Sequence, residues 1–450
     1  MEETDNYYIH QAYIVNENKV FQGDVLIQRG KIARIMGSKA PVEELSMHPD
    51  TRYIDATGLY LLPGGIDEHV HFRDPGLTHK GDFSSESRAA VAGGVCSVLD
   101  MPNTIPQTTS KALWEAKQAS AAGKMHCNYA FYVGATNHNL EEIKSLDTRQ
   151  VAGVKLFLGS STGDMLLSDE AVLEKIFQWQ RLPLLAHCES ESIIHQNTEK
   201  ARRTYGEEAP FRIHSEIRSA AACLESSRRA VELAKKTHAP LHILHVSTKE
   251  ELQLLDERHP EITMEACPSY LLFSDEDYDR LGCRIKCNPA VKTASDRAAL
   301  QQALQDGRIL CVGSDHAPHT WDEKQRDYFH SPSGMPMVGH SLLILLELCH
   351  QQKLKLARVA ELFSHHPASL LQIAGKGFIR EQYDADLVLV DLNQTTTVSR
   401  DNCHYRCHWT PLEGYTLHGR IVSTFVNGHR VYHEGSFSEK TYGTPLLFNR

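Results

Sequence analysis

Hydrophobic and polar positions divide the chain into a central region and two ends of a different character. From residue 1 to 63, short apolar segments alternate with polar residues and turns, which is typical of β-strands with one buried face. Residues 376–450 repeat this pattern, and Val426-Asn427-Gly428-His429 is a hairpin signal. The expected strands are 12–15, 23–28, 31–36, 60–62, 386–390, 421–426 and 430–432. We therefore expect 1–63 and 376–450 to form one composite β-sandwich domain.

The central region, 64–375, alternates apolar runs with helical patterns. Eight runs lack polar alternation, which is typical of parallel strands buried on both faces. They are 65–72, 95–101, 128–133, 154–158, 182–187, 241–246, 262–267 and 309–313. The first four begin 30, 33 and 26 residues apart, close to the ~30 residues of one βαβ unit. The sequence thus predicts an α/β fold, a (β/α)₈ TIM-type barrel, with the β-sandwich formed by both termini.

Composition narrows the functional classes. The hydrophobic fraction of 41% and the charged fraction of 23% are typical of a globular enzyme. The net charge of −10, without a clustered basic face, argues against nucleic acid as a partner. No apolar run approaches the ~20 residues that span a membrane, so no membrane partner is expected. Eleven scattered cysteines favour a reduced, cytoplasmic compartment.

Polar side chains at the predicted strand ends carry the candidate chemistry. His69 and His71 lie two residues apart on the first strand, so both project to one face and can ligate one metal. The other candidate ligands are Lys155 on strand four, His187 after strand five, His245 after strand six and Asp315 after strand eight. Because the ends of barrel strands converge on one mouth, imidazoles and a carboxylate there form a plausible zinc site.

Each candidate has an ordinary structural explanation as well. With 26 histidines, chance gives about one or two His-x-His pairs. His187 or His245 alone is more often a hydrogen-bonded core residue, and Asp315 is as readily a helix cap. A lysine within an apolar strand is expensive to bury as a cation, unless Lys155 extends its charged end to solvent. The joint arrangement is harder to obtain by accident than any one member.

Three motifs resemble those of a known family. They are His71-Phe72-Arg73-Asp74-Pro75-Gly76, Met101-Pro102-Asn103-Thr104 and Asp315-His316-Ala317-Pro318-His319. With Pro63-Gly64-Gly65-Ile66-Asp67, they resemble the amidohydrolase superfamily and, within it, the cyclic-amidase group of dihydroorotases, hydantoinases and allantoinases. The similarity is greatest to the dihydroorotase family and covers the whole predicted barrel.

The resemblance implies a ligand set and a reaction. His69 and His71 would bind the more buried of two zinc ions, with Asp315 as a further ligand, and His187 and His245 would bind the second. Lys155, N-carboxylated, would bridge both ions. The implied reaction interconverts N-carbamoyl-L-aspartate and (S)-dihydroorotate in pyrimidine biosynthesis, with a metal-bridging hydroxide as nucleophile and Asp315 as general base and acid. Dimers are common among such relatives, so a homodimer is possible.

Substrate choice is expected to depend on four other residues. A guanidinium fork suits the carboxylate of dihydroorotate, which hydantoin and allantoin lack, and Arg73 is well placed for it. Asn103 and His319 could complete this clamp, and Asn288 matches a family position that contacts the ring. The alternatives are an ion pair of Arg73 with Asp74 or Glu68 and a turn role for Asn103.

Other readings remain open at this point. An allantoinase or a dihydropyrimidinase/hydantoinase would use the same metal chemistry, and a non-catalytic scaffold would be expected to lose ligands. The late segment 334–340 and the pair Pro289-Ala290 depart from the family pattern, and the loop 321–337 is a candidate lid. We expect three further features to lie outside the catalytic centre: the Cys403-His404 and Cys407-His408 pairs, His242, and Cys188.

Overall fold

The computed structural model describes residues 5–37, 49–159 and 165–450. Within them, parallel strands form the predicted barrel, with β8 and β9 together as its third segment. The strands are β6 (Gly65–Val70), β7 (Val95–Asp100), β8 (Asn128–Phe131), β9 (Val133–Gly134), β10 (Val154–Phe157), β11 (Leu184–His187), β12 (Leu241–Ile243), β13 (Ile262–Ala266) and β14 (Cys311–Val312). The barrel closes where Val70 bridges His316, and the backbone N–H of His71 donates to the His316 carbonyl at 2.8 Å.

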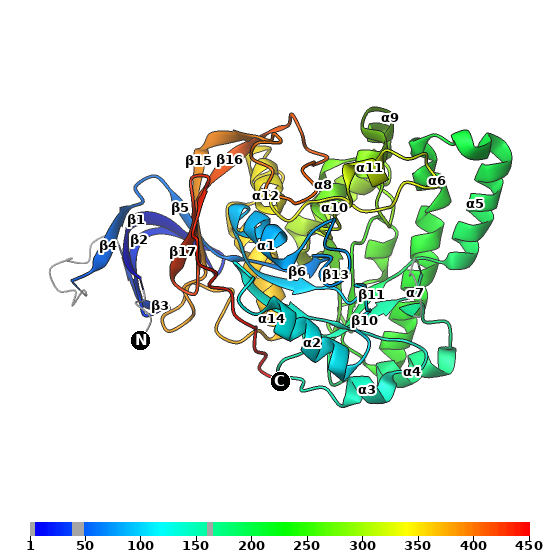
Figure 1. Ribbon diagram of the computed structural model, residues 1–450, viewed down its shortest axis with the longest axis horizontal. Coiled ribbons are helices and arrows are strands. Elements are labelled where there is room, and N and C mark those ends of the chain that lie inside the picture. The colour runs from blue at the N-terminus through cyan, green and yellow to red at the C-terminus, as the bar shows by residue number, and fades with distance from the viewer. Residues whose placement is uncertain (1–4, 38–48, 160–164) are drawn as a thin grey trace.

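Helices cover the outside of the barrel (Figure 1). The longer ones are α1 (Phe83–Ala92), α2 (Lys111–Ala121), α4 (Glu170–Trp179), α5 (Glu191–Tyr205), α7 (Ala220–Thr237), α10 (Ala294–Asp306) and α12 (Ser341–His350). The shorter ones are α3 (Leu140–Lys144), α6 (His214–Ile217), α8 (Pro268–Leu272), α9 (Tyr278–Leu281), α11 (Trp321–Lys324), α13 (Leu356–Ala360) and α14 (His366–Leu371). No helix in the described ranges is long and apolar enough to cross a membrane.

Both ends of the chain meet in one sheet, as predicted. Its strands are β1 (Asn6–Asn16), β2 (Lys19–Gln28), β3 (Lys31–Gly37), β4 (Thr51–Asp55), β5 (Tyr60–Pro63), β15 (Leu387–Thr397), β16 (Thr416–Val426), β17 (His429–His433) and β18 (Ser436–Phe437). Antiparallel pairing of β5 with β15 joins the two ends, and Figure 1 shows the blue and red strands side by side. The rings of Tyr7 and Phe425 meet edge to face at 5.2 Å, within a core shared by both ends. Residues 1–4 and 38–48 of the expected terminal domain lie outside the described ranges.

Some element bounds differ from the sequence-based prediction for local reasons. The run 182–187 becomes a strand only from Leu184, because Pro183 has no N–H to donate. The run 241–246 ends as a strand at Ile243, because His245 adopts a left-handed backbone with φ 41°. Strand β4 was not predicted, since its sequence Thr-Arg-Tyr-Ile-Asp lacks a clear apolar face and its side chains are partly or fully exposed.

The loop between β6 and α1 carries Arg73 and Lys80. It ends at the capped N-terminus of α1. Asp82 caps α1 by accepting a hydrogen bond from the Ser85 N–H at 2.8 Å, and Ser85 bonds back to the Asp82 N–H. Arg406, from the segment between β15 and β16, pairs with Asp82. The terminal sheet thereby helps to fix the loop that reaches over the barrel mouth.

Candidate metal centre

All ten residues singled out from the sequence line one cavity of about 380 Å³ at the barrel mouth. The six expected ligands are His69, His71, Lys155, His187, His245 and Asp315, and the four expected substrate contacts are Arg73, Asn103, Asn288 and His319. Nine or more tenths of each imidazole ligand and of Lys155 are buried, while Asp315 is more open to the cavity.

One group combines two imidazoles with a carboxylate. Oδ1 of Asp315 lies 3.3 Å from Nε2 of His69 and 3.1 Å from Nε2 of His71. The other ring nitrogen, Nδ1, of His69 lies 2.9 Å from Glu265 Oε1, and that of His71 lies 2.7 Å from Asn103 Oδ1. With Nδ1–H donating to these oxygens, the Nε2 lone pairs of both rings face the Asp315 oxygen.

This first group has the chemistry of a cation site. Burial lowers the pKa of His69 to about 3 and that of His71 to about 4, so both rings are neutral at physiological pH. Burial raises the pKa of Asp315, but His69 and His71 outweigh it and bring it to about 2, so the carboxyl is ionised. Two imidazole nitrogens and a carboxylate oxygen that converge on one point are a donor set that suits a divalent metal.

The second pair of imidazoles lies directly beside the first. Nδ1 of His187 is 2.8 Å from Nε2 of His245, and the ring centroids of His69 and His245 are 5.3 Å apart. Nε2 of His187 donates to Glu189 Oε2 at 2.9 Å, which leaves Nδ1 as an acceptor facing His245. Burial lowers the pKa of both His187 and His245, so this pair also offers neutral nitrogen donors.

Lys155 lies within the apolar strand β10 and is 1% exposed. Among the described residues, none forms a hydrogen bond or ion pair with its Nζ, which lies 4.8 Å from the Phe157 ring centroid. Burial lowers the pKa of Lys155 to about 8, against the opposing effect of Asp315 and Glu265. A substantial fraction of the amine is therefore uncharged near neutral pH.

Arg73 and His319 face the ligand cluster from the loops after β6 and β14. Arg73 Nε donates to the Pro318 carbonyl at 3.0 Å, and Nη2 lies 3.1 Å from Nε2 of His319. The side chain is 8% exposed, and no carboxylate in the described part of the chain lies within ion-pair distance of it. The alternative ion pair of Arg73 with Asp74 or Glu68 is thus not formed.

Three residues of the site adopt backbone conformations that non-glycine residues rarely take. Arg73, His245 and Asp315 have φ of 69°, 41° and 46°. Each follows a barrel strand, so the left-handed residue turns its side chain back over the strand ends. Such conformations persist only where surrounding contacts hold them, and they are concentrated at functional sites.

The loop 321–337 is a candidate lid from its sequence. In this structure it forms one wall of the cavity and is held in place by hydrogen bonds. Pro332, Ser333 and Gly334 line the cavity. Beneath them, Nζ of the fully buried Lys324 donates to the carbonyls of Lys286, Pro332 and Gly334 at 3.1, 2.9 and 3.0 Å. A backbone hydrogen bond from the Gly334 N–H to the Lys286 carbonyl, at 2.9 Å, adds to these three. Together the four hydrogen bonds hold the loop against the barrel.

Sequence reasoning missed several residues of the site. Glu265 and Glu189 orient His69 and His187, and Lys80 lines the cavity with its Nζ 3.1 Å from Nδ1 of His319. Glu265 carried a usable signal, because it is a charged residue within the apolar run 262–267, as Lys155 is within 154–158. Lys80 carried none, since it lies in a polar loop.

The features expected to lie outside the centre do so. Neither His242 nor Cys188 lines the cavity, and burial raises the pKa of the Cys188 thiol to about 12, which keeps it protonated. Cys403 and Cys407 both direct their Sγ toward the Trp409 carbonyl, and neither lines the cavity.

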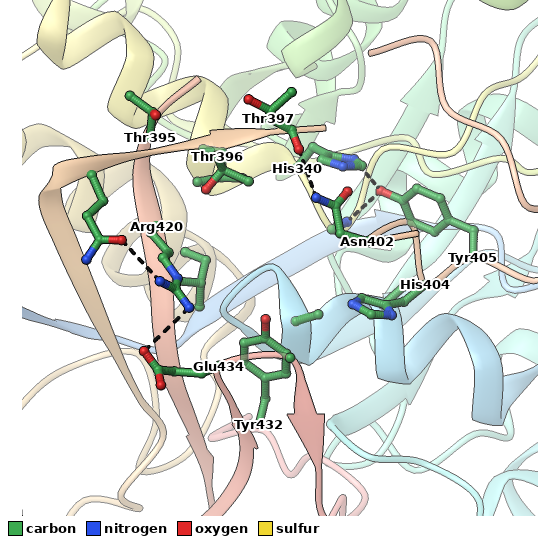
Figure 2. Close-up of a pocket in the computed structure, with 17 residues that line it drawn as sticks. His340, Thr395, Thr396, Thr397, Asn402, His404, Tyr405, Arg420, Tyr432 and Glu434 are labelled. Carbon is green, nitrogen blue, oxygen red and sulfur yellow. Dashed lines mark hydrogen bonds and ion pairs between the residues drawn. The ribbon is translucent and has the colours of Figure 1, made fainter. Parts of the chain in front are cut away.

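A second cavity, of about 360 Å³, lies between α1, the start of α12 and the sheet strands β15–β17 (Figure 2). His404 is on its wall, and Tyr405 bonds there with Nδ1 of His340 at 2.7 Å. Arg420 on the opposite side is already paired with Glu434 at 3.4 Å. This cavity shares no lining residue with the one at the barrel mouth.

Comparison with known proteins relates the whole chain to one group of enzymes. The sequence profile of the amidohydrolase family matches residues 60–431. The chain is 34% identical to the dihydroorotase of Methanosarcina mazei over 90% of each chain. It is 36% identical to the allantoinase of Rubrobacter xylanophilus, over 85% of this chain and 86% of that one. The solved L-hydantoinase (dihydropyrimidinase) from Arthrobacter aurescens is 27% identical, with a TM-score of 0.93 over 99% of this chain and 100% of that one.

Proposed function

This chain belongs to the amidohydrolase family, and from that premise we propose that it is a metal-dependent dihydroorotase. Relatives named dihydroorotase, allantoinase and hydantoinase are hydrolases of cyclic amides, and this chain is a cyclic amidohydrolase. The proposed reaction is the reversible interconversion of N-carbamoyl-L-aspartate and (S)-dihydroorotate, a step of pyrimidine biosynthesis.

One observation carries the choice of substrate: Arg73 is a buried cation without a carboxylate partner among the described residues, in the same cavity as the candidate ligands. A buried charge without a counter-ion is unfavourable, so the guanidinium is best satisfied when the bound molecule brings an anion. Dihydroorotate and carbamoyl-aspartate carry such a carboxylate, and a guanidinium fork can bind it through two parallel hydrogen bonds. Allantoin and hydantoin carry none.

The proposed metal ligands follow the two groups of donors. His69, His71 and Asp315 would hold one zinc ion, and His187 and His245 a second. Lys155 would bridge the two ions as an N-carboxylated lysine, because an ammonium has no lone pair to give and its carbamate has two anionic oxygens. When bound, the metal ions would lower the pKa of a water molecule and polarise the amide carbonyl.

Asp315 is the proposed proton carrier. Its carboxylate is ionised, lines the cavity and stands next to both imidazoles of the first group. In hydrolysis it would accept a proton from the attacking water and pass it to the departing ring nitrogen. In ring closure it would take the proton from the carbamoyl nitrogen. One carboxylate can perform both transfers because the two directions use the same atoms in reverse order.

Four side chains are proposed to position the substrate. Arg73 and His319 would bind the carboxylate, while the amides of Asn103 and Asn288 would bind the ring. Oδ1 of Asn288 is buried and has no hydrogen-bond partner among the described residues, which suits a group that meets its partner only in the substrate. Among the described residues, Asn103 forms a side-chain hydrogen bond only through Oδ1, with His71, so its NH₂ group can donate to a ligand.

The test is a comparison of substrates with the metal-loaded protein. Dihydroorotate and carbamoyl-aspartate should be turned over with kcat/KM at least roughly 100-fold higher than allantoin or hydantoin, because a site built around a charged partner strongly rejects analogues that lack it. A preference for either neutral ring would overturn the substrate assignment and favour an allantoinase or hydantoinase. Intact-protein and peptide mass spectrometry should find one added carbon dioxide on Lys155, and metal analysis should find bound zinc.

A further inference from the structure

A second group of potential metal ligands lies inside the barrel, apart from the cavity at its mouth. Glu68 of β6, His242 of β12 and Cys311 of β14 each offer one donor atom, and these atoms all lie within 4.8 Å of one another. Their exposed fractions are 0%, 1% and 0%. None of the three lines the cavity that holds the catalytic candidates.

A local irregularity brings Glu68 into this position. The pairing of β6 with β7 shifts register between Asp67 and Val70. Asp67 pairs with Val98 and Val70 with Asp100, so β6 has one more residue than β7 in this stretch. Such a bulge breaks the strict alternation of side chains. Consecutive residues Glu68 and His69 can therefore both face the barrel interior, Glu68 toward His242 and Cys311, and His69 toward His71 and Asp315.

The orientation of His242 is that of a metal ligand. Its Nδ1 lies 2.7 Å from the Thr263 hydroxyl, while Nε2 lies 3.5 Å from Cys311 Sγ. Burial lowers the pKa of His242 to about 3, so the ring is neutral. With Nδ1–H donating to the hydroxyl, the lone pair of Nε2 faces the thiol and Glu68, which is how a second partner commonly orients a ligating histidine.

Glu68 has no cationic partner in this group. Both of its carboxyl oxygens are buried, and among the described residues the Cys311 thiol is the side chain that interacts with them. No lysine or arginine of the described ranges forms an ion pair with it. Because no such cation offsets a negative charge here, a bound metal ion would supply the positive charge that an ionised Glu68 lacks.

We propose that Glu68, His242 and Cys311 bind a structural divalent cation of the thiolate-accepting class, with Zn²⁺ as the fitting ion. Tetrahedral zinc with its usual bond lengths to sulfur and nitrogen places those two ligand atoms about 3.6 Å apart, close to the 3.5 Å between Cys311 Sγ and His242 Nε2. Glu68 supplies the third ligand atom through one of its oxygens. On binding, the Cys311 thiol releases its proton to solvent and the sulfur pair forms the bond to the metal.

Such a site would stabilise the seam of the barrel. Strand β14 has only two residues, Cys311–Val312, and the chain after it meets β6 through the Val70–His316 bridge and through Ser314, whose N–H donates to Asp67 Oδ1 at 3.0 Å. A metal held by Glu68 and Cys311 would directly link β6 and β14, the first and last strands of the barrel. His242 would also attach β12, the sixth strand, to the same ion. Because the three ligands are fully buried, the ion would enter during folding and be held tightly afterwards.

The experiment uses the signature of sulfur in the metal's ligand shell. None of the proposed catalytic ligands is a cysteine, so a metal–sulfur signal reports a thiolate site whether or not the substrate assignment holds. Cys267, which is grouped with His69 and Glu265, is the other buried thiol to be distinguished from Cys311. X-ray absorption on the zinc-loaded wild-type protein should detect a Zn–S distance of about 2.3 Å. Protein produced with Co²⁺ should show a thiolate-to-cobalt charge-transfer band in the near ultraviolet.

Two variants assign the signal. Cys311→Ser should abolish the band and lower the bound metal by one equivalent per chain, with turnover retained. Cys267→Ser, which alters another buried thiol near the centre, should keep the band. Absence of metal–sulfur scattering in the wild-type protein would overturn the proposal, even if Cys311→Ser fails to fold. So would an unchanged band and metal content in folded Cys311→Ser, and Glu68, His242 and Cys311 would then be a hydrogen-bonded cluster only.

Discussion

Nη2 of Arg73 lies 3.1 Å from Nε2 of His319, and Lys80 approaches the other ring nitrogen, Nδ1, at the same distance. The Nε2 atom also lies 3.1 Å from the Ser333 carbonyl, and the tautomer of the ring decides whether Nε2 accepts from Arg73 or donates to Ser333. Burial, aided by the charge of Arg73, lowers the pKa of His319 well below its usual value, so the ring is neutral. The Pro318 carbonyl holds Arg73 through its Nε–H, the neutral imidazole contacts the guanidinium without neutralising it, and the charge remains for a ligand.

Substitution of Arg73 should weaken recognition of the substrate carboxylate while leaving the metal ligands intact. Arg73→Met should lower kcat/KM for carbamoyl-aspartate by roughly 100-fold or more, since a buried hydrogen-bonded charge pair is worth several kcal/mol when one partner is removed. Arg73→Lys keeps the charge but loses the fork, so a loss of about tenfold is expected. Steady-state kinetics and metal analysis of the purified variants measure both effects.

The matched control is Arg203→Met on the exposed face of α5, which should leave the kinetics unchanged. If Arg73→Met retained the wild-type kcat/KM for carbamoyl-aspartate, the carboxylate would be bound elsewhere.

We expect Asn103 to have two roles. Its Oδ1 would orient the metal ligand His71, and its NH₂ group would bind the substrate. Its Oδ1 orients His71, and its NH₂ group faces the cavity without another partner among the described residues. Asn103→Leu should weaken metal affinity by about 10- to 100-fold, as is usual when the partner of a ligating histidine is lost, and should also raise KM. Asn103→Asp still accepts the His71 hydrogen, so it should keep the metal and raise KM alone, because it repels an anionic substrate.

Metal titration by competition with a chelator, together with KM for carbamoyl-aspartate, separates these two effects. Equal metal loss in Asn103→Asp and Asn103→Leu would contradict the proposed division of roles.

The sequence was sufficient for the barrel and for the six candidate metal ligands at its strand ends, because both follow from short-range patterns, whereas Asn288 was identified only through the family resemblance. Apolar runs define the strands, and residues at the ends of parallel strands must converge. Local motifs therefore brought His69 and Asp315 together although they are far apart along the chain.

What the sequence could not supply depends on contacts between distant segments. Glu265 orients His69 only because β13 and β6 lie on either side of β14 in the closed barrel, and Lys80 meets His319 through a loop whose path no local pattern specifies. Likewise, Glu68 gains its neighbours from a bulge. The alternation rule by itself would turn Glu68 to the face opposite His69.

Lys324 should be essential for the shape of the cavity wall. Its ammonium donates to three carbonyls at once, and Lys324→Met leaves these buried oxygens unsatisfied. We expect a loss of about 2 kcal/mol in the free energy of unfolding and a raised KM, since Pro332 and Gly334 line the cavity. Urea denaturation and steady-state kinetics measure both, with the exposed Lys200→Met as control. Unchanged KM in Lys324→Met would mean that the wall does not depend on this lysine.

Lys155 should become carboxylated more readily as the pH rises toward 8. Only the neutral amine has the lone pair that attacks carbon dioxide, and burial lowers the pKa of Lys155 to about 8 from 10.5. At pH 7 about one amine in ten is then neutral, against roughly one in 3,000 for an ordinary lysine.

Metal-free protein given zinc at a fixed concentration of dissolved carbon dioxide should therefore regain activity at a rate that increases about tenfold per pH unit below 8 and levels off above it. The sign follows from the lowered pKa, because protonation below 8 removes the nucleophile. Lys155→Ala should regain no activity at any pH. A rate that is independent of pH from 6 to 8, or one that keeps rising to pH 10, would contradict a buried, partly neutral lysine as the group that takes up carbon dioxide.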